Sequence, residues 1–216
     1  MSFDLLAPHY RWMEAVLAGG KLQRCRTAFI EEVKDTRHAL IVGEGNGRFL
    51  SALLRVNPSV RVLCVDGSAR MLECARARLH QQGLSTCNVE FVHADVTKWS
   101  PPRAGFDLIV THFFLDCFRP EQLGEIVAQI SRAAAPSARW LIADFSEPAH
   151  GFAHWRAHSI LALMYCFFRI ATGLPARWLT PPDSFLERHG FQLKARRHAE
   201  WGLLHSDVWR FAGPAS

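Results

Sequence analysis

Apolar runs alternate with helix-like segments throughout the chain after residue 38, and this order restricts the fold more than any other feature. The runs are ALIVG (39–43), VRVLCVD (60–66), VEFVHAD (89–95), FDLIVTHFF (106–114) and RWLIADF (139–145). Helix-like segments lie between them at 47–56, 68–82 and 120–135. Nearly continuous apolar strands separated by helices are typical of a parallel sheet buried on both faces, with right-handed crossovers. The sequence therefore predicts a doubly wound α/β fold.

The two ends of the chain follow different patterns. Residues 191–201 and 203–211 are strand-like and are separated by a short turn that contains glycine, so they predict an antiparallel hairpin at one edge of the sheet. Residues 8–18 and 21–34 suggest two helices before the first strand. With 216 residues and no linker-like segment, we expect a single domain over 1–216.

Composition narrows the class of protein. Apolar residues make up 49% of the chain and charged residues 21%, which favours a globular protein over a disordered one. The net charge of +5 is scattered along the chain and gives only weak support for a nucleic-acid or lipid partner. The six cysteines form no CxxC pair, and the N-terminal sequence has no basic segment followed by an apolar one. We therefore expect a protein of the cytoplasm.

One apolar segment, His158 to Leu174, needs a separate interpretation. Arg169 interrupts it, and it is shorter than the about 20 apolar residues that a membrane span requires. A helix that is buried in the core, in a dimer interface or against a substrate fits better. Stable membrane insertion is not expected, whereas peripheral contact and the oligomeric state stay open.

Three glycines, Gly43, Gly45 and Gly47, follow the first apolar run and precede a helix. A glycine turn between a strand and a helix N-terminus exposes backbone N–H groups to a ligand, and nucleotides bind at such turns. The GxGxG spacing differs from the GxGxxG of dinucleotide-binding proteins, which disfavours a dehydrogenase.

Two acidic residues end the next two apolar runs. Asp66 closes VLCVD, where its carboxylate can accept hydrogen bonds from the hydroxyls of a ribose. Asp95 closes FVHAD, where it can accept from the amine of adenine. Each could instead cap a helix, but with the glycine turn they favour an adenosine site.

These motifs resemble those of the class I S-adenosylmethionine-dependent methyltransferases. VGEGNGRFL looks like the first motif of the family, VDGSARMLECA like its ribose-binding second strand, and HADV like its adenine-binding third strand. FDLLAPHYRW and DGSARML look most like small-molecule methyltransferases of the quinone-biosynthesis group. The resemblance implies a Rossmann-like, seven-stranded, mostly parallel sheet whose last strand is antiparallel, with S-adenosyl-L-methionine as cofactor.

The resemblance also assigns candidate residues. The family usually has an acidic residue at the position of Ile41, so Glu44, or backbone carbonyls near Gly43 and Thr111, would hold the methionine amino group. Tyr10 resembles an aromatic residue that covers the cofactor, within N-terminal helices at 1–37. The expected cofactor-binding residues are Tyr10, Gly43, Glu44, Gly45, Asp66, Gly67, Ser68, Met71, Asp95, Val96 and Thr111.

Catalytic and substrate residues are expected beyond the fourth apolar run. His112 and Asp116 are the candidate general bases, although each could instead have a purely structural role. The same two roles are open to Asp144. A helical insertion at 146–189 would cover the acceptor pocket. The candidate substrate residues are Phe113, Phe114, Tyr165, Phe168 and Arg169.

The sequence thus predicts a methyltransferase that acts on a small, lipophilic or aromatic acceptor. No NPPY-like segment follows the fourth run, so a nucleic-acid substrate is not expected. His150, His154 and His158 are spaced four apart, but no recognised zinc pattern includes them, and no metal is expected. The alternative is a catalytically silent protein that binds the cofactor, or only keeps the fold, and acts through partners.

Overall fold

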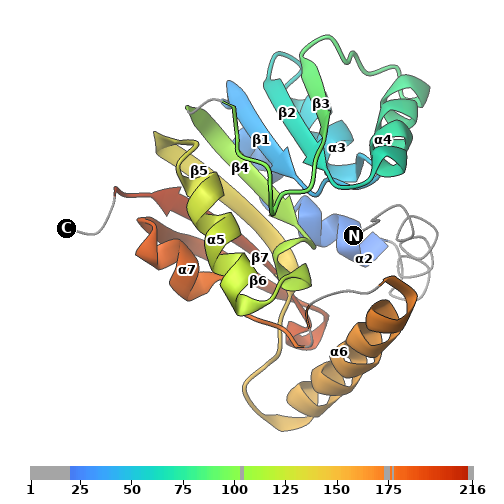
Figure 1. The fold of residues 1–216 in the computed structure, drawn as a ribbon, viewed down its shortest axis with the longest axis vertical. Coiled ribbons are helices and arrows are strands. Elements are labelled where there is room, and N and C mark those ends of the chain that lie inside the picture. Colours follow the sequence, from blue (N-terminus) through green and yellow to red (C-terminus); the bar gives the residue numbers. More distant parts are fainter. Residues whose placement is uncertain (1–19, 103–104, 173–175, 177, 214–216) are drawn as a thin grey trace.

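The computed structural model describes residues 20–102, 105–172, 176 and 178–213, with the side chains of 168–172 excluded. Seven strands form one sheet in the order β3-β2-β1-β4-β5-β7-β6 (Figure 1). The strands are β1 (His38–Val42), β2 (Arg61–Asp66), β3 (Val89–His93), β4 (Phe106–His112), β5 (Ala134–Phe145), β6 (Phe191–Ala199) and β7 (Leu204–Phe211). Neighbouring strands from β3 to β5 pair in parallel, and β7 runs antiparallel between β5 and β6. The predicted fold class is confirmed.

Helices cover both faces of the sheet. On one face, α3 (Arg48–Val56) and α4 (Ala69–Gln81) pack on the strands through residues such as Phe49 and Leu72. On the other face lie α5 (Pro120–Ser131) and α7 (Asp183–Arg188), which pack through Leu123 and Leu186. Strands β1, β2, β4 and the C-terminal half of β5 are therefore buried on both sides, which explains their nearly continuous apolar sequences, whereas β3 lies at the sheet edge and is only partly buried.

A third cluster lies at the C-terminal ends of the strands. There α2 (Gly20–Arg26) and the long helix α6 (Gly151–Thr172) meet the ends of β4, β5 and β7 (Figure 1). Leu22 of α2, Phe145 of β5 and Leu161 of α6 belong to this cluster. These two helices thus stand at the end of the sheet where ligands of α/β proteins bind.

Some boundaries differ from the prediction. The expected helix over 21–34 ends at Arg26, and a short 3₁₀ helix, η2 (Ile30–Val33), follows. Phe29 has a non-helical backbone, with φ of −121° and ψ of 32°, so the α-helix ends before it. Helix α6 starts at Gly151, before the apolar stretch used to predict it. No helix within the described residues is long and apolar enough to cross a bilayer.

Candidate functional site

A pocket that is open to solvent lies at the C-terminal ends of β1, β2 and β4. The glycine turn, the β2–α4 turn and the loop after β4 form its walls. Its lining residues are Val42, Gly43, Gly45, Val65, Asp66, Gly67, Ser68, Met71, Ala94, Val96, Phe113, Phe114, Cys117 and Phe118. The pocket therefore brings residues expected to bind cofactor together with two expected to bind substrate.

Asp66 connects the glycine turn to the β2–α4 turn. Its Oδ2 accepts a hydrogen bond from the Gly45 N–H at 2.8 Å, and its Oδ1 accepts one from the Ser68 N–H at 2.9 Å. Ser68 also caps α4, because its hydroxyl accepts from the Met71 N–H. Each carboxylate oxygen has two lone pairs, so Asp66 can still accept hydrogen bonds from a ligand in the pocket.

The three glycines of the turn serve different purposes. All three have positive φ, a conformation that favours glycine. A β-carbon on Gly43 would stand 2.2 Å from Phe114 Cδ2, and one on Gly47 would stand 2.8 Å from the Ala75 backbone of α4. A β-carbon on Gly45 would meet nothing within 4 Å. Gly43 and Gly47 thus permit close packing within the protein, whereas only Gly45 faces open space.

Glu44 lies at the N-terminus of α3 and does not line the pocket. Its Oε1 accepts hydrogen bonds from the N–H groups of Phe49, at 2.8 Å, and Leu50, at 3.0 Å. Burial raises the pKa of this carboxyl to about 7, although the two backbone hydrogen bonds and the charge of Arg26 oppose the shift. Ile41, at the position usually acidic in the family, is 1% exposed in the core.

Asp95 holds the loop after β3. Its Oδ1 accepts from the backbone N–H of Thr97 at 3.0 Å and from the Thr97 hydroxyl at 2.7 Å. Burial acts to raise the pKa of Asp95, but these hydrogen bonds outweigh it and leave the pKa below its usual value. The next residue, Val96, lines the pocket, whereas Asp95 itself does not.

Thr111 and His112 end β4 but face away from the pocket. The Thr111 hydroxyl accepts a hydrogen bond from the Trp140 indole at 2.9 Å in the core. The His112 ring packs edge-on against Phe49 of α3, with centroids 4.6 Å apart. Its Nδ1 is buried and has no hydrogen-bond partner, and burial together with Arg26 holds the His112 pKa well below its usual value. A neutral, buried imidazole at this place contributes to packing.

Two buried carboxyls, Asp116 and Asp144, meet beside the pocket. Asp116 follows β4 and is next to Cys117, which lines the pocket, while Asp144 lies near the end of β5. The Asp116 N–H donates to Asp144 Oδ2 at 3.3 Å, which brings the two carboxyls close together. Burial raises the pKa of Asp116 to about 6 and that of Asp144 well above its usual value. The pair can therefore hold a proton near neutral pH.

Phe113 has an unusual backbone for a residue that is not glycine, with φ of 52°. Its ring lines the pocket, and the buried guanidinium of Arg26 lies 4.9 Å from the ring centroid. Such a conformation persists only where the surroundings enforce it, and it is found frequently at functional sites. Arg26 and Phe118 were missed by sequence reasoning, since no local motif marks them.

The remaining expected substrate residues lie partly outside what can be described. The Tyr165 hydroxyl donates to the Asp116 carbonyl at 3.2 Å, so it is directed toward the carboxyl pair, and its ring packs in the cluster around α6. Tyr10 and the side chains of Phe168 and Arg169 fall outside the described residues.

His154 and His158 both face Glu147, with Nδ1 to Oε1 distances of 3.4 Å and 2.9 Å.

Comparison with known proteins agrees with this architecture. Residues 39–137 match the family described as "Methyltransferase domain". The ubiquinone/menaquinone biosynthesis C-methyltransferase UbiE of Pseudomonas putida (strain GB-1) is 30% identical over 151 residues, which cover 68% of this chain and 58% of that protein. A malonyl-[acyl-carrier protein] O-methyltransferase of Paenibacillus sp. (strain JDR-2) is 32% identical over 113 residues, covering 51% and 39%. The chain thus spans less than two thirds of the length of these relatives.

Solved structures share the fold. The mitomycin 7-O-methyltransferase MmcR superimposes with a TM-score of 0.72 at 19% identity, covering 98% of this chain and 61% of that one. Together with the glycine turn, the acidic residue ending β2 and the strand order, these matches identify the family. The chain contains a class I, S-adenosylmethionine-dependent methyltransferase domain, similar to the quinone-biosynthesis group.

Proposed function

We propose that this protein transfers the methyl group of S-adenosylmethionine to a small, apolar or aromatic acceptor. One observation carries the proposal: a single pocket joins the glycine turn and Asp66 to the aromatic residues Phe113, Phe114 and Phe118. Groups that can hydrogen-bond an adenosine thus lie next to an apolar surface that can bind an acceptor. Direct methyl transfer requires this arrangement, because the two bound molecules must lie in contact and in line.

The residues present fit the cofactor. Asp66 retains acceptor capacity toward a ribose, and the open face of Gly45 admits a ligand against the backbone. Met71, Ala94 and Val96 provide apolar surface for the adenine ring. When bound, S-adenosylmethionine supplies an activated methyl group on a sulfonium with a good leaving group, so the protein mainly aligns the reactants and excludes water.

Asp116 is the general base in this proposal. It lies next to Cys117 in the pocket wall, and its pKa of about 6 suits a group that accepts a proton at neutral pH. Asp144 hydrogen-bonds it and acts as a positioning residue. His112 is a weaker candidate because its ring packs against Phe49 on the other face of the sheet.

The acceptor class follows from the pocket wall and from the relatives. UbiE acts, by its name, in ubiquinone and menaquinone biosynthesis as a C-methyltransferase, so hydroxylated aromatic rings and quinone precursors are the first acceptors to test.

We further propose one domain over 1–216, with 1–37 covering the cofactor and 146–189 covering the acceptor. The six cysteines are free thiols in the structure, which supports a cytoplasmic location.

Calorimetry with S-adenosylmethionine and S-adenosylhomocysteine tests the cofactor. Micromolar binding of both, lost in Asp66→Ala, is the expected result. Methyl transfer is then tested with isotopically labelled S-adenosylmethionine against phenols, quinone precursors, thiols and fatty acids. Binding of NADH in place of the methyl donor would contradict the proposal.

A second candidate is a catalytically silent protein that binds the cofactor or only keeps the fold. Two observations favour it: the core residue Ile41 offers no charge to a methionine amino group, and Glu44 is engaged at the N-terminus of α3. Tight cofactor binding without turnover of any acceptor would support this alternative.

A further inference from the structure

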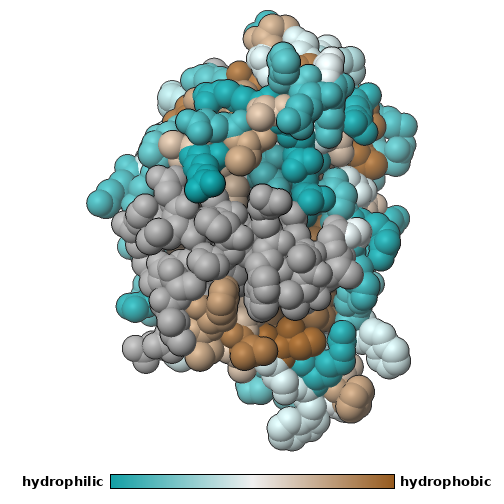
Figure 2. All heavy atoms as spheres, turned by 90° about the vertical axis from the view of Figure 1, so that its right-hand side faces the viewer, coloured by the Kyte–Doolittle hydropathy of each residue, from teal (hydrophilic) through white to brown (hydrophobic). Residues whose placement is uncertain are grey.

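Strand β7 carries two ionisable side chains into the interior of the protein. Charged and polar groups usually stay at the surface, and the face seen in Figure 2 is accordingly mostly hydrophilic over α4. On β7, by contrast, His205 is 4% exposed and Asp207 is fully buried. Burial of such groups costs free energy unless they are paired, so their partners indicate what they do. Neither residue takes part in the mechanism proposed above.

Asp207 is fixed by contacts with two strands. The Arg196 guanidinium of β6 donates to both carboxylate oxygens, at 2.8 Å and 2.6 Å, and the Trp209 indole donates to Oδ2 at 3.2 Å. Arg196 also donates to Asp183 of α7 at 2.8 Å. Burial acts to raise the pKa of Asp207, but the contacts with Arg196 and His205 outweigh it and leave the pKa below its usual value. Asp207 is therefore a fixed negative charge inside the protein.

His205 faces both Asp207 and the carboxyl pair of Asp116 and Asp144. Its Nδ1 lies 3.0 Å from Asp207 Oδ1 but forms no aligned hydrogen bond with any described residue, so the contact is electrostatic. On the other side, His205 is the register partner of Asp144 on β5. Opposite residues of antiparallel strands project from the same face, with β-carbons about 4.5–5.5 Å apart. The strand register thus places an imidazole beside the pair.

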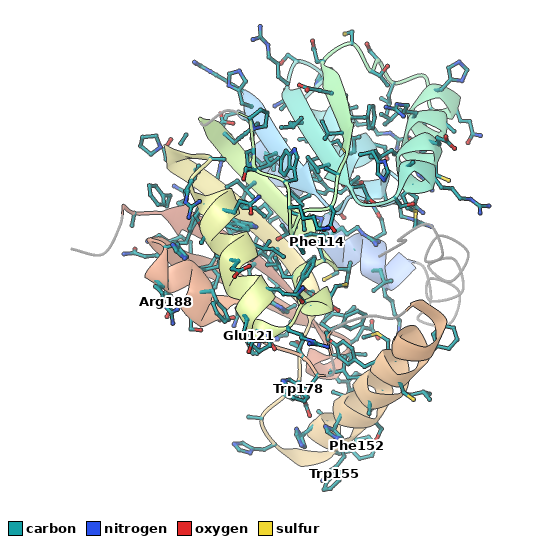
Figure 3. All side chains as sticks on the ribbon, in the orientation of Figure 1. Phe114, Glu121, Phe152, Trp155, Trp178 and Arg188 are labelled. Atoms are coloured by element: carbon teal, nitrogen blue, oxygen red, sulfur yellow. The ribbon has the colours of Figure 1, made fainter. Side chains whose placement is uncertain are left out.

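The carboxyl pair holds one negative charge at neutral pH. Burial keeps Asp144 protonated, whereas Asp116, with a pKa of about 6, is ionised. Figure 3 shows Phe114 at the C-terminal end of β4, and Asp116 follows it by two positions, so this charge lies close to the pocket. A buried carboxylate is costly unless a positive group lies nearby.

The other groups packed around the pair do not supply that positive charge. Cys117 and the Tyr165 hydroxyl, which donate to Asp116, are neutral donors. Cys25 of α2 donates to the His205 carbonyl, and burial raises its pKa to about 11, so it is neutral as well. Burial raises the pKa of Asp116, and the charge of His205 is among the influences that lower it.

Two further basic residues lie in the surroundings of the pair. Arg26, also on α2, has its guanidinium over the Phe113 ring in the pocket wall. His198 of β6 is the second register partner of His205, but it is exposed and lies two strands away from β5. His205 is therefore the basic side chain that the fold places against Asp144.

We propose that His205, anchored by Asp207 and Arg196, is a positioning residue that supplies the positive charge beside which Asp116 acts as general base. The proposal rests on the proposed function, which assigns that role to Asp116. In the reaction Asp116 takes the proton that the acceptor loses as it receives the methyl group, and the pair becomes neutral. His205 touches no reacting atom and neither gains nor loses a proton in this step.

Infrared spectroscopy tests the proposal without methyl transfer. The C=O stretch of a protonated carboxyl differs from that of a carboxylate, so spectra recorded across the pH range around 6 follow Asp116. Each protein is compared with the same protein carrying Asp116→Asn, which isolates the band of this residue. We expect His205→Gln to move the ionisation of Asp116 to higher pH by about one pH unit, since a neutral amide replaces a positive charge.

His198→Gln is the matched control, because it removes a histidine from the strand next to His205 without touching the pair. Its Asp116 band should match that of the wild type. In the active enzyme, His205→Gln should also move the acidic limb of kcat/KM to higher pH, with unchanged affinity for S-adenosylmethionine. Nitrogen NMR of the His205 ring in the wild type is a second measurement that needs no folded variant. The ring signals should change where Asp116 ionises, because interacting groups titrate together.

Two results would overturn the proposal. One is an Asp116 band in folded His205→Gln that ionises at the same pH as in the wild type. The other is a set of His205 ring signals that does not respond when Asp116 ionises. A shifted band in a protein that transfers no methyl group to any acceptor would support the contact between His205 and the pair and overturn only the role of Asp116 as base.

Discussion

The ring of Phe114 rests on the backbone of Gly43, so closely that a β-carbon at that glycine would overlap the ring at 2.2 Å. Phe114 comes from the loop after β4 and Gly43 from the turn after β1. The first glycine of the turn is therefore required by a residue of the protein, whereas Gly45 has open space beside it in the pocket. The next prediction separates these two roles.

Gly43→Ala should destabilise the fold by about 3 kcal/mol, because the new methyl group clashes with Phe114 and the positive φ strains an L-residue. Gly45→Ala meets no neighbour and should cost about 1 kcal/mol from the backbone alone. Urea denaturation measures both. S-adenosylmethionine affinity should fall in Gly45→Ala, and Phe114→Ala should partly restore the stability of Gly43→Ala. Equal destabilisation by the two glycine variants would contradict this division of roles.

Asp66→Ala should weaken S-adenosylmethionine binding about tenfold to a hundredfold, since hydrogen bonds to a charged acceptor are each worth about 1.5–3 kcal/mol. It also removes the acceptor for the N–H groups of Gly45 and Ser68, so the stability of the variant must be measured beside its affinity. Glu73→Ala, an exposed acidic residue on α4, is the matched control. Unchanged affinity in Asp66→Ala would exclude the ribose role.

The stability of the protein should depend on pH through Glu44. Its carboxyl has a pKa of about 7 in the fold, against 4.5 when unperturbed. Between these values the unfolded chain has lost the proton and the folded chain keeps it, so the free energy of unfolding falls as pH rises, by up to about 1.4 kcal/mol per pH unit. Above pH 7 both states are ionised and the loss is complete.

Glu44→Gln should remove this contribution, because the amide oxygen can still accept from the N–H groups of Phe49 and Leu50 without a buried charge. Relative to the wild type, the variant should gain about 3 kcal/mol on going from pH 4.5 to pH 8. Urea titrations across this range measure the difference, with the exposed Glu73→Gln as control. A constant difference at all pH values would show that Glu44 titrates normally.

Asp116→Asn should lower kcat about a hundredfold without changing S-adenosylmethionine affinity, as expected for loss of a general base. In the wild type, kcat/KM should rise with pH through an acidic limb near pH 6, because Asp116 accepts a proton only when ionised. Asp144→Asn should leave this limb near pH 6, because burial keeps Asp144 protonated and an amide can donate to Asp116 as the protonated carboxyl does. A pH profile without such a limb would argue against Asp116.

Much of the architecture could be read from local patterns. The apolar runs became β1 to β5, the C-terminal pair became the hairpin β6–β7, and the stretch after Asp66 became α4 with Ser68 as its cap. These features depend on residues a few positions apart, whose periodicity and side-chain hydrogen bonding act within one element. The placement of Asp66 beside the glycine turn could also be predicted, because β1 and β2 are parallel strands and their C-terminal ends lie at the same edge of the sheet.

The details of the site depended on contacts that no local pattern encodes. Glu44 turned toward α3 because unpaired helix N–H groups were within reach of its side chain. Asp116 and Asp144, far apart in the sequence, met only because β4 and β5 pair in register and place their ends together. His112 faced the core for a related reason: alternation along β4 sent its ring to the α3 side.

The sequence by itself determined a doubly wound sheet with a nucleotide-type turn and an adjacent acidic residue, because strand and helix periodicity and turn chemistry are local properties. It left undecided whether the apolar helix after β5 is buried, covers a substrate or lies at an interface. Only the tertiary structure showed that α6 buries Leu161 and leaves Trp155 in solvent. Burial depends on which elements occupy the space around a helix, and that space is defined only when the whole chain has folded.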